Sequence, residues 1–345
     1  MMTRFSIACV VVCVAAFLTM LVPARSEVAT ASGGRDDVRI GLVFDVGGRG
    51  DKSFNDSAYA GLDRARREFG VTVEMIEPSG AEDREAAMRL FAARGFDLVL
   101  GVGFIFSTDI EVVAGAFPNT SFACVDYAPS SDRELPSNLA GLVFREEEGA
   151  FLVGAVAGLV TKTKAVGFVG GMNVPLIRKF EAGYRAGVGH VCSECRVLSA
   201  FAGTTPEAFR DPAKGEALAT SQYSAGADVV FHASGSTGLG VFEAARDMRA
   251  WAIGVDSDQY DEMPGSVLTS MVKRVDVVVY ETIRDVLGAR FVGGVHVFGV
   301  KEGAIGYVNE GPHAEMIPVE VRDKVDGIRD GIREGDIAVG AAMGR

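Results

Sequence analysis

The sequence predicts an α/β protein built from two lobes. Its 345 residues exceed the roughly 150 that one domain usually needs, so each half is long enough to form its own core. Apolar runs alternate with helix-like stretches along the chain, which is the pattern of parallel strands joined by helices. Two such series of similar length stand on either side of a polar, proline-containing stretch at 129–138, where we expect the chain to pass between the lobes.

The composition is that of a globular protein with an acidic surface. Hydrophobic residues make up 48% of the chain and charged residues 23%, with a net charge of −12 and a pI of about 4.9. A nucleic-acid partner needs clustered Lys and Arg to neutralise its phosphates. The acidic balance therefore argues against nucleic-acid binding.

The first series predicts four strands and three helices. Its apolar runs do not alternate with polar residues, as expected for strands that helices cover on both faces. The strands are expected at 38–44, 71–76, 97–101 and 121–125, and the helices at 57–69, 81–93 and 108–116.

The second series opens with an apolar helix at 150–160. Three glutamates precede it and suit a helix N-terminus, and it is too short to span a bilayer, so it is expected in the core. Strands follow at 165–170, 197–201, 229–232 and 251–255, with helices at 176–189, 214–225 and 238–248. After a break at 256–264 we expect a strand at 267–271, a helix at 275–287 and a strand-like run at 294–308.

The N-terminus has the features of a secretory signal peptide. Arg4 precedes an apolar run from Phe5 to Val22, and small residues near Ala24 and Ala31 offer cleavage sites. We expect residues 1–31 to be this signal, although the run is also long enough for an uncleaved anchor. The predicted location is the periplasm or another extracytoplasmic compartment.

Two of the cysteines outside this segment are three residues apart. Cys192 and Cys195 form the sequence CSEC, in a predicted turn after a helix, and an oxidising compartment permits a small disulfide there. A redox enzyme would need this motif at the start of a helix. We expect a structural or incidental pair, and the sequence leaves open whether it is oxidised.

Two aspartates stand at equivalent places, each at the end of an apolar run. In open α/β sheets ligands collect at the carboxyl ends of strands and at helix N-termini. Asp45 and Asp126 can each accept hydrogen bonds from a ring N–H or amino group. A helix cap or an Asx-turn is an equal alternative.

Two phenylalanines are candidates for contact with a flat ligand. Phe54 follows a glycine-rich turn, and Phe209 lies in a loop of the second series. Stacking on a base contributes roughly 1 to 3 kcal/mol per aromatic side chain. Without further information, core packing remains the simpler interpretation of Phe54.

Polar groups follow the later strands of the second series. Gly235 lies in the turn HASGSTG, whose backbone N–H groups can meet ribose oxygens or an anion, or simply form a tight turn. Asp256 is placed to accept both hydrogen bonds of a vicinal diol, and Lys273 can add a donor or remain a solvated surface charge.

The sequence contains no complete catalytic or cofactor motif. The turn at 47–53 breaks the order of a phosphate loop, 256–262 departs from a calcium loop, and none of the four histidines pairs locally with a nucleophile and an acid. We therefore expect neither an enzyme nor a metal or cofactor.

Several segments resemble, in order, those of the basic-membrane-protein family. Its members are extracytoplasmic substrate-binding proteins of ABC transporters, and purine nucleoside receptors are its best understood branch. The resemblance extends from residue 38 to about 307. It rests on FDVGGRGDKSFNDSAYAG, CVDYAP, FREEEGAFLVGAVAG, VGFVGG, KFEAGYRAG, GADVVFHASGSTGLGV, IGVDSDQ and LTSMVKRVD.

The resemblance implies two Rossmann-like lobes of the type I periplasmic-binding-protein fold, joined by three hinge crossovers. The crossovers are expected near Pro129, Asp256 and Phe291. The N-terminal lobe would then comprise 37–128 and 258–290, and the C-terminal lobe 139–255 and 292–320.

The resemblance also implies a nucleoside site between the lobes. Phe54 and Phe209 would stack on the base, Asp45 and Asp126 would bind the base, and Asn55 is a weaker addition. Gly235, Asp256 and Lys273 would contact the ribose.

The partners that the resemblance implies are a nucleoside, of the purine class, and a membrane ABC permease complex, with the receptor acting as a monomer. Many family members are lipoproteins with a cysteine after the apolar run, but Cys9 and Cys13 lie inside it, so no lipid anchor is expected. A nucleoside hydrolase, a sugar or autoinducer receptor, and a sensor subunit or adhesin remain as alternatives.

Overall fold

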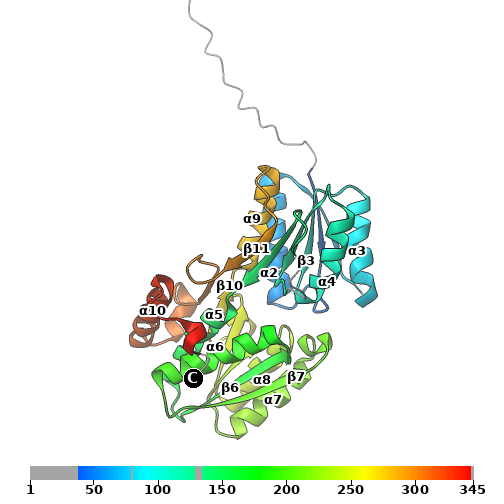
Figure 1. The fold of residues 1–345 in the computed structure, drawn as a ribbon. Helices are drawn as coiled ribbons and strands as arrows, with labels where there is room; N and C mark the ends of the chain where they lie inside the picture. The colour runs from blue at the N-terminus through cyan, green and yellow to red at the C-terminus, as the bar shows by residue number, and fades with distance from the viewer. Residues whose placement is uncertain (1–37, 79–80, 129–133, 343–345) are drawn as a thin grey trace, which may run out of the picture. The chain divides into compact units, whose positions relative to one another are not determined.

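The described part of the protein contains two six-stranded sheets, each with helices on both faces (Figure 1). The computed structural model describes residues 38–78, 81–128 and 134–342, so the predicted signal peptide at 1–31 lies outside the described residues. None of the helices within these ranges combines the length and apolar character that a membrane span needs.

The first sheet forms the N-terminal lobe, and all its strand pairs are parallel. Its order is β11-β5-β4-β3-β1-β2. The strands are β1 (Arg39–Val43), β2 (Thr72–Ile76), β3 (Leu98–Val102), β4 (Ser121–Val125), β5 (Leu139–Phe144) and β11 (Gly294–Phe298). Helices α3 (Ala81–Ala93) and α4 (Ser107–Ala116) cover one face, and α2 (Phe54–Phe69) and α9 (Val275–Leu287) the other (Figure 1).

The second sheet forms the C-terminal lobe in the order β12-β10-β9-β8-β6-β7, with β12 antiparallel to its neighbour. Its strands are β6 (Ala165–Met172), β7 (Arg196–Gly203), β8 (Val229–Ala233), β9 (Trp251–Asp256), β10 (Val267–Lys273) and β12 (Ile305–Tyr307). Its helices are α5 (Glu146–Val160), α6 (Pro175–Val191), α7 (Pro212–Ser224), α8 (Thr237–Met248), α10 (Val319–Glu334) and α11 (Val339–Ala342).

The prediction of two α/β lobes is confirmed, and several elements have the predicted bounds. Strand β4 and helices α3 and α9 begin and end at the expected residues. Strand β3 is buried throughout, as the lack of alternation in its sequence indicated. Helix α10 was not predicted, although its buried residues recur at helical spacing, at Val321, Val325, Ile328 and Ile332.

Within the described residues the chain crosses between the two sheets three times, but not at the predicted places. It leaves the first sheet at Arg145, between β5 and α5, and returns at Arg274, between β10 and α9. The third crossing is the segment 299–304, between β11 and β12. The crossings are bonded together, because the backbone N–H of Arg145 donates to Phe298 O and that of Arg274 to Ala304 O, both at 2.8 Å.

These crossings correct the predicted lobe boundaries. Strand β5 pairs with β4, so the polar stretch at 129–138 precedes another strand of the same sheet, and 139–144 does not start the C-terminal lobe. Strand β10 pairs with β9 rather than joining the N-terminal lobe. Strand β11 pairs with β5, so no crossing occurs near Phe291. A polar segment marks a surface loop, whichever sheet receives the next strand.

Candidate functional site

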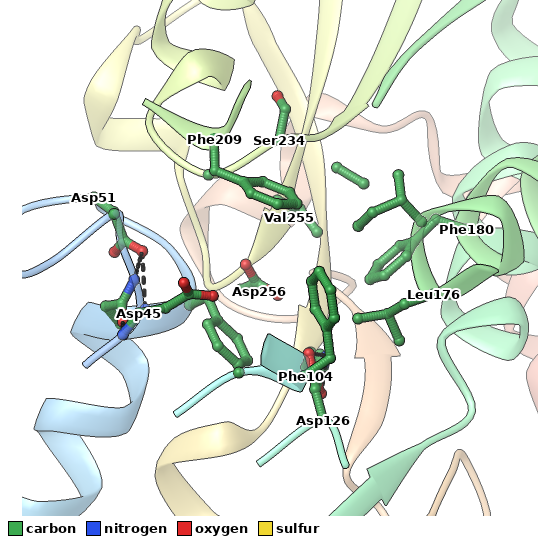
Figure 2. Close-up of a pocket in the computed structure, with 18 residues that line it drawn as sticks. Asp45, Asp51, Phe104, Asp126, Leu176, Phe180, Phe209, Ser234, Val255 and Asp256 are labelled. Atoms are coloured by element: carbon green, nitrogen blue, oxygen red, sulfur yellow. Dashed lines mark hydrogen bonds and ion pairs between the residues drawn. The ribbon is translucent and has the colours of Figure 1, made fainter. Parts of the chain in front are cut away.

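The carboxyl ends of strands from both sheets meet at a pocket (Figure 2). Its empty volume is about 610 Å³, including space open to solvent. All eight residues singled out from the sequence line it, namely Asp45, Phe54, Asn55, Asp126, Phe209, Gly235, Asp256 and Lys273. The structure thus brings together residues that are up to 228 positions apart in the sequence, from Asp45 to Lys273.

One wall of the pocket is the turn between β1 and α2. The carboxylate of Asp51 accepts hydrogen bonds from the backbone N–H groups of Ser53 and Asn55, both at 2.9 Å, and of Asp56 at 3.1 Å. These donors are the free N–H groups of a helix start, so α2 begins at Phe54, three residues before its predicted start. The earlier start places Phe54 in the first turn of the helix.

Asn55 holds this turn together as well as lining the pocket. Its Nδ2 donates to Asp51 Oδ2 at 3.0 Å, and its Oδ1 accepts from the backbone N–H of Asp45 at 3.2 Å. Both ends of the amide are therefore bonded within the N-terminal lobe. Asn55 therefore acts on the site by holding Asp45 in place as well as by lining the pocket.

Asp45 presents a partly buried carboxylate to the pocket. One oxygen accepts a hydrogen bond from the backbone N–H of Val46 at 2.6 Å. Burial raises the pKa of Asp45 to about 7, against the smaller opposing effect of that hydrogen bond. Gly103 packs against this carboxylate. An added Cβ at position 103 would lie 2.5 Å from Asp45 Oδ2, so a larger residue there would displace the Asp45 side chain.

Lys273 and Asp126 form a buried ion pair at the floor of the pocket. The ammonium Nζ of Lys273 lies 2.7 Å from Asp126 Oδ2 and 3.2 Å from Glu146 Oε1. Burial alone lowers the pKa of Lys273, but the nearby carboxylates, Asp126 first, outweigh it and raise the pKa above its usual range. Lys273 is thus a buried cation, not the solvated surface charge that the sequence left open.

Asp256 ends β9 on the opposite side of the pocket. It accepts a hydrogen bond from the hydroxyl of Ser53, which belongs to the other lobe. Burial raises the pKa of Asp256 to about 7, although Lys273 opposes the shift. The backbone of Asp256 is left-handed, with φ of 67°, a conformation that Asp tolerates better than most residues.

Phe209 is held in place by the turn that contains Gly235. The hydroxyl of Ser236 donates to Phe209 O at 3.1 Å, and that of Thr237 to Ala208 O at 2.8 Å. An added Cβ at Gly235 would lie 3.0 Å from Phe209 O, a tight contact, and the positive φ of 56° at this residue also favours glycine. The phenyl ring lies over Gly171, where a Cβ would come within 2.3 Å of it.

Several pocket residues were missed by sequence reasoning. Phe104, Leu176, Ile177 and Phe180 supply an apolar side to the pocket. Figure 2 shows Phe104, Leu176 and Phe180 there. Phe104 follows β3 just as Asp45 follows β1, so its position at a strand end was a usable signal. Phe180 reads as an ordinary apolar residue of a helix, and nothing in the sequence separates it from a core position.

The turn before α2 accepts hydrogen bonds from the C-terminal lobe. Lys52 O accepts hydrogen bonds from Gln259 Nε2 at 2.8 Å and from the Ser257 hydroxyl at 3.3 Å. Arg210 Nη1 donates to Val46 O at 3.4 Å. The described conformation is therefore one in which the two lobes touch at the rim of the pocket.

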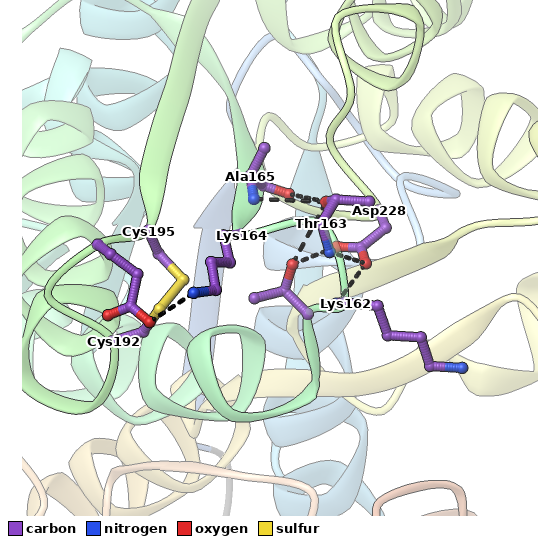
Figure 3. Close-up of a disulfide and its surroundings, with 9 residues drawn as sticks. Lys162, Thr163, Lys164, Ala165, Cys192, Cys195 and Asp228 are labelled. Atoms are coloured by element: carbon purple, nitrogen blue, oxygen red, sulfur yellow. Dashed lines mark hydrogen bonds and ion pairs between the residues drawn. A yellow bond between two sulfur atoms is a disulfide. The ribbon is translucent and has the colours of Figure 1, made fainter.

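The cysteine pair lies outside the pocket. Cys192 and Cys195 form a disulfide in the turn after α6, as the sequence permitted (Figure 3). Neither cysteine is among the pocket-lining residues. The bond closes the end of α6 onto the start of β7.

Known proteins are similar to this chain over most of its length. It is 35% identical to a protein of Pyrococcus furiosus named as an uncharacterized lipoprotein, over 79% of this chain and 71% of the relative. It is 32% identical to basic membrane protein A of Borreliella afzelii, over 87% of this chain and 91% of the relative. The archaeal relative's name gives no support to the expectation that the chain lacks a lipid anchor.

A solved structure has the same architecture. An ABC transporter solute-binding protein of Aeropyrum pernix superposes with a TM-score of 0.79 at 31% identity, covering 87% of this chain and 92% of that one. The prediction of a type I periplasmic-binding-protein fold is thereby confirmed. The family model described as "ABC transporter substrate-binding protein PnrA-like" matches residues 38–331. The chain therefore belongs to the Bmp family of extracytoplasmic ABC transporter substrate-binding proteins.

Proposed function

We propose that this substrate-binding protein captures a nucleoside, of the purine class, and delivers it to a membrane ABC permease complex. The observation that carries the proposal is the composition of the pocket. Two phenylalanines from opposite lobes, Phe54 and Phe209, share it with acidic groups at the strand ends. Aromatic faces suit a planar base, and carboxylates suit its N–H groups and the hydroxyls of a sugar.

The charge of the pocket favours an uncharged ligand with several hydrogen-bond donors. Asp45, Asp126 and Asp256 line the pocket together with one cation, Lys273, whose charge is already shared with Asp126 and Glu146. A ligand phosphate would meet net negative charge in a poorly solvated site. We therefore expect the protein to prefer nucleosides over their phosphate esters.

The raised pKa values suit the same kind of ligand. A carboxylate that is buried with spare acceptor positions is costly until a donor arrives. Asp45 from the first lobe and Asp256 from the second are both in this state, with pKa values of about 7. A ligand that donates to both stabilises the conformation in which the lobes are closed, which is the form that a permease can recognise.

Titration calorimetry of the purified protein with guanosine, inosine, adenosine, uridine, free guanine and ribose tests the proposal. We expect tight binding of at least one purine nucleoside. The variant Phe54→Ala should lose affinity by about 1 to 3 kcal/mol, the usual contribution of a stacked aromatic. The matched control is Phe117→Ala, a partly buried phenylalanine of the same lobe that does not line the pocket.

Binding of ribose alone, with Phe54→Ala unchanged, would overturn the aromatic part of the proposal. Release of free guanine from guanosine by the purified protein would show a hydrolase instead. A receptor for transport should also show reduced nucleoside uptake when its gene is deleted, which separates it from a sensor or an adhesin.

A further inference from the structure

A row of four alternating charges runs from the pocket into the C-terminal lobe. Lys273 Nζ bonds to Asp126 Oδ2 at 2.7 Å and to Glu146 Oε1 at 3.2 Å. Glu146 Oε2 in turn lies 2.5 Å from Lys179 Nζ, which also donates to the carbonyl oxygen of Phe144 at 2.9 Å. Asp126 and Lys273 line the pocket, whereas Glu146 and Lys179 do not.

The row lies beside two of the three crossings between the lobes. Glu146 is the first residue of α5, directly after the crossing at Arg145, and Lys273 is the last residue of β10, directly before the crossing at Arg274. The side chain of Glu146 is 0% exposed and that of Lys273 is 1% exposed. Ion pairs so well shielded from water keep their strength and their geometry.

We infer that Glu146, braced by Lys179, is a positioning residue that aims the ammonium group of Lys273 at the ligand. Lys273, Glu146 and Lys179 all belong to elements of the C-terminal lobe, and only Asp126 comes from the N-terminal lobe. The bond from Lys273 to Glu146 therefore does not depend on closure, whereas the bond to Asp126 does.

The geometry of an ammonium group explains how this acts on the ligand. Lys273 has three N–H donors at tetrahedral directions. Glu146 Oε1 accepts one of them at 3.2 Å, and Asp126, whose two carboxylate oxygens lie 2.6 and 2.7 Å from Nζ, takes a second, so the direction of the third is fixed. Since Lys273 lines the pocket, with Nζ 5.1 Å from the centre of the Phe54 ring, that third donor is available to a ligand oxygen.

Lys179 completes the arrangement by balancing the charge of Glu146. Without Lys179, Glu146 would add a buried negative charge beside Asp126. Without Glu146, Lys179 would be a second cation near Lys273, and Lys273 would turn wholly toward Asp126. Either loss changes the direction or the strength of the donor that the ligand meets.

The test rests on the proposed function and uses two ligands that differ only at the sugar. Guanosine and 2′,3′-dideoxyguanosine are titrated into the wild type, Glu146→Gln, Lys179→Met and the double variant. A hydrogen bond from a charged donor is worth about a tenfold change in affinity or more. We expect Glu146→Gln to weaken guanosine binding about tenfold while the dideoxy ligand changes less than about threefold.

The double variant should recover part of this loss, because it removes one charge of each sign. Glu146→Asp keeps a carboxylate and should keep more of the guanosine affinity than Glu146→Gln. Recovery in both variants is expected if charge and direction matter, and not if Glu146 merely fills space.

Asp228→Asn is the matched control for loss of stability. The carboxylate of Asp228 accepts hydrogen bonds from the Thr161 hydroxyl at 2.6 Å and from the backbone N–H groups of Lys162 at 2.7 Å and Thr163 at 3.2 Å (Figure 3). It lies in the same lobe but does not line the pocket. Its replacement should lower stability and leave the preference for guanosine over the dideoxy ligand unchanged.

Equal losses for both ligands in Glu146→Gln, or the same pattern as in Asp228→Asn, would overturn the inference. If the wild type binds no nucleoside, the proposed function fails, and the charge row is then judged by urea unfolding. In that case additive effects of Glu146→Gln and Lys179→Met would overturn it, and a clear coupling between them would support it.

Discussion

Two aspartates at opposite ends of the second sheet are used in opposite ways. Asp228 precedes β8, and its carboxylate accepts three hydrogen bonds from the segment 161–163 of its own lobe (Figure 3). Asp256 ends β9, is 7% exposed, and accepts its hydrogen bond from Ser53 of the other lobe. A carboxylate has about four acceptor positions, so Asp228 is largely satisfied within the fold.

The contrast indicates which carboxylate lowers the stability of the fold and serves function instead. Burial raises the pKa of Asp256 to about 7, because the charged form loses water without regaining enough partners. A carboxylate that the fold itself satisfies supports structure. A carboxylate that is buried with acceptor positions still open can accept a hydrogen bond from a ligand.

The largest effect is expected from removing the cation of the pocket. Lys273→Met leaves Asp126 and Glu146 buried together without the ammonium group that bonds to both. Breaking a buried ion pair from one side costs about 3 to 5 kcal/mol of stability. Urea unfolding should show a loss of this size, and calorimetry should show that guanosine binding is abolished.

The exposed pair between Lys164 and Glu194 is the control for this change. Its atoms lie 3.0 Å apart, and both side chains are more than half exposed, at 62% and 55%. Lys164→Met should cost less than about 1 kcal/mol, as solvent-exposed pairs do. If Lys273→Met and Lys164→Met lost the same unfolding free energy, burial would not distinguish the ion pair at the pocket from the exposed one.

The second effect is a change in how stability depends on pH. A pKa raised from 3.8 to about 7 means that folded Asp256 holds a proton that the unfolded chain releases. Its contribution to stability is therefore fully present below about pH 4 and is lost as the pH rises through about 7. Asp256→Asn lacks this loss, so we expect the variant to gain on the wild type between these limits.

Urea unfolding of both proteins at steps from pH 4.5 to 7.5 measures this gain. The difference in unfolding free energy should change by up to about 1.4 kcal/mol per pH unit, the maximum for one proton. If the unfolding free energies of wild type and variant changed in parallel with pH, the pKa of Asp256 would not be raised by folding. The contrast with Asp228 would then be lost.

A smaller effect is expected from displacing one aromatic ring. In Gly171→Ala the new Cβ would lie 2.3 Å from the ring of Phe209, so the ring must shift within the pocket. Loss of an aromatic contact costs about 0.5 to 1.5 kcal/mol, so guanosine affinity should fall a few-fold. In Gly189→Ala, on α6, the added Cβ meets no atom within 4 Å, so affinity should stay unchanged. Equal affinities for the two variants would argue against a role for Phe209.

How much of this could be foreseen depends on the range of the signal. Alternation of apolar runs and helical stretches is local, and it predicted most helices and strands within a few residues. The crossings between lobes were misplaced because each of the first two is a single residue, Arg145 or Arg274, between a strand and a helix. Nothing in local composition separates such a residue from an ordinary connection within one lobe.

The site shows the same limit. Asp45, Asp126 and Asp256 were found because each ends an apolar run, and parallel strands bring their carboxyl ends to one edge. Phe209 was a candidate from its loop, but its place opposite Phe54 came from the resemblance, because its support comes from the hydroxyls of Ser236 and Thr237 across a loop. The bond from Lys273 to Glu146 joins residues 127 positions apart, which no periodicity predicts.

The smallest effect on the ligand is expected at the disulfide, at the structural end of the lobe. Cys192 and Cys195 join the end of α6 to β7 and do not line the pocket (Figure 3). Closing so short a loop stabilises a fold by about 2 kcal/mol at most, chiefly by restricting the unfolded chain. The double variant Cys192→Ser, Cys195→Ser should therefore unfold at lower urea while binding guanosine with unchanged affinity by calorimetry. A marked loss of affinity would show that the two ends of this lobe are coupled, and the separation between a structural end and a binding end would have to be given up.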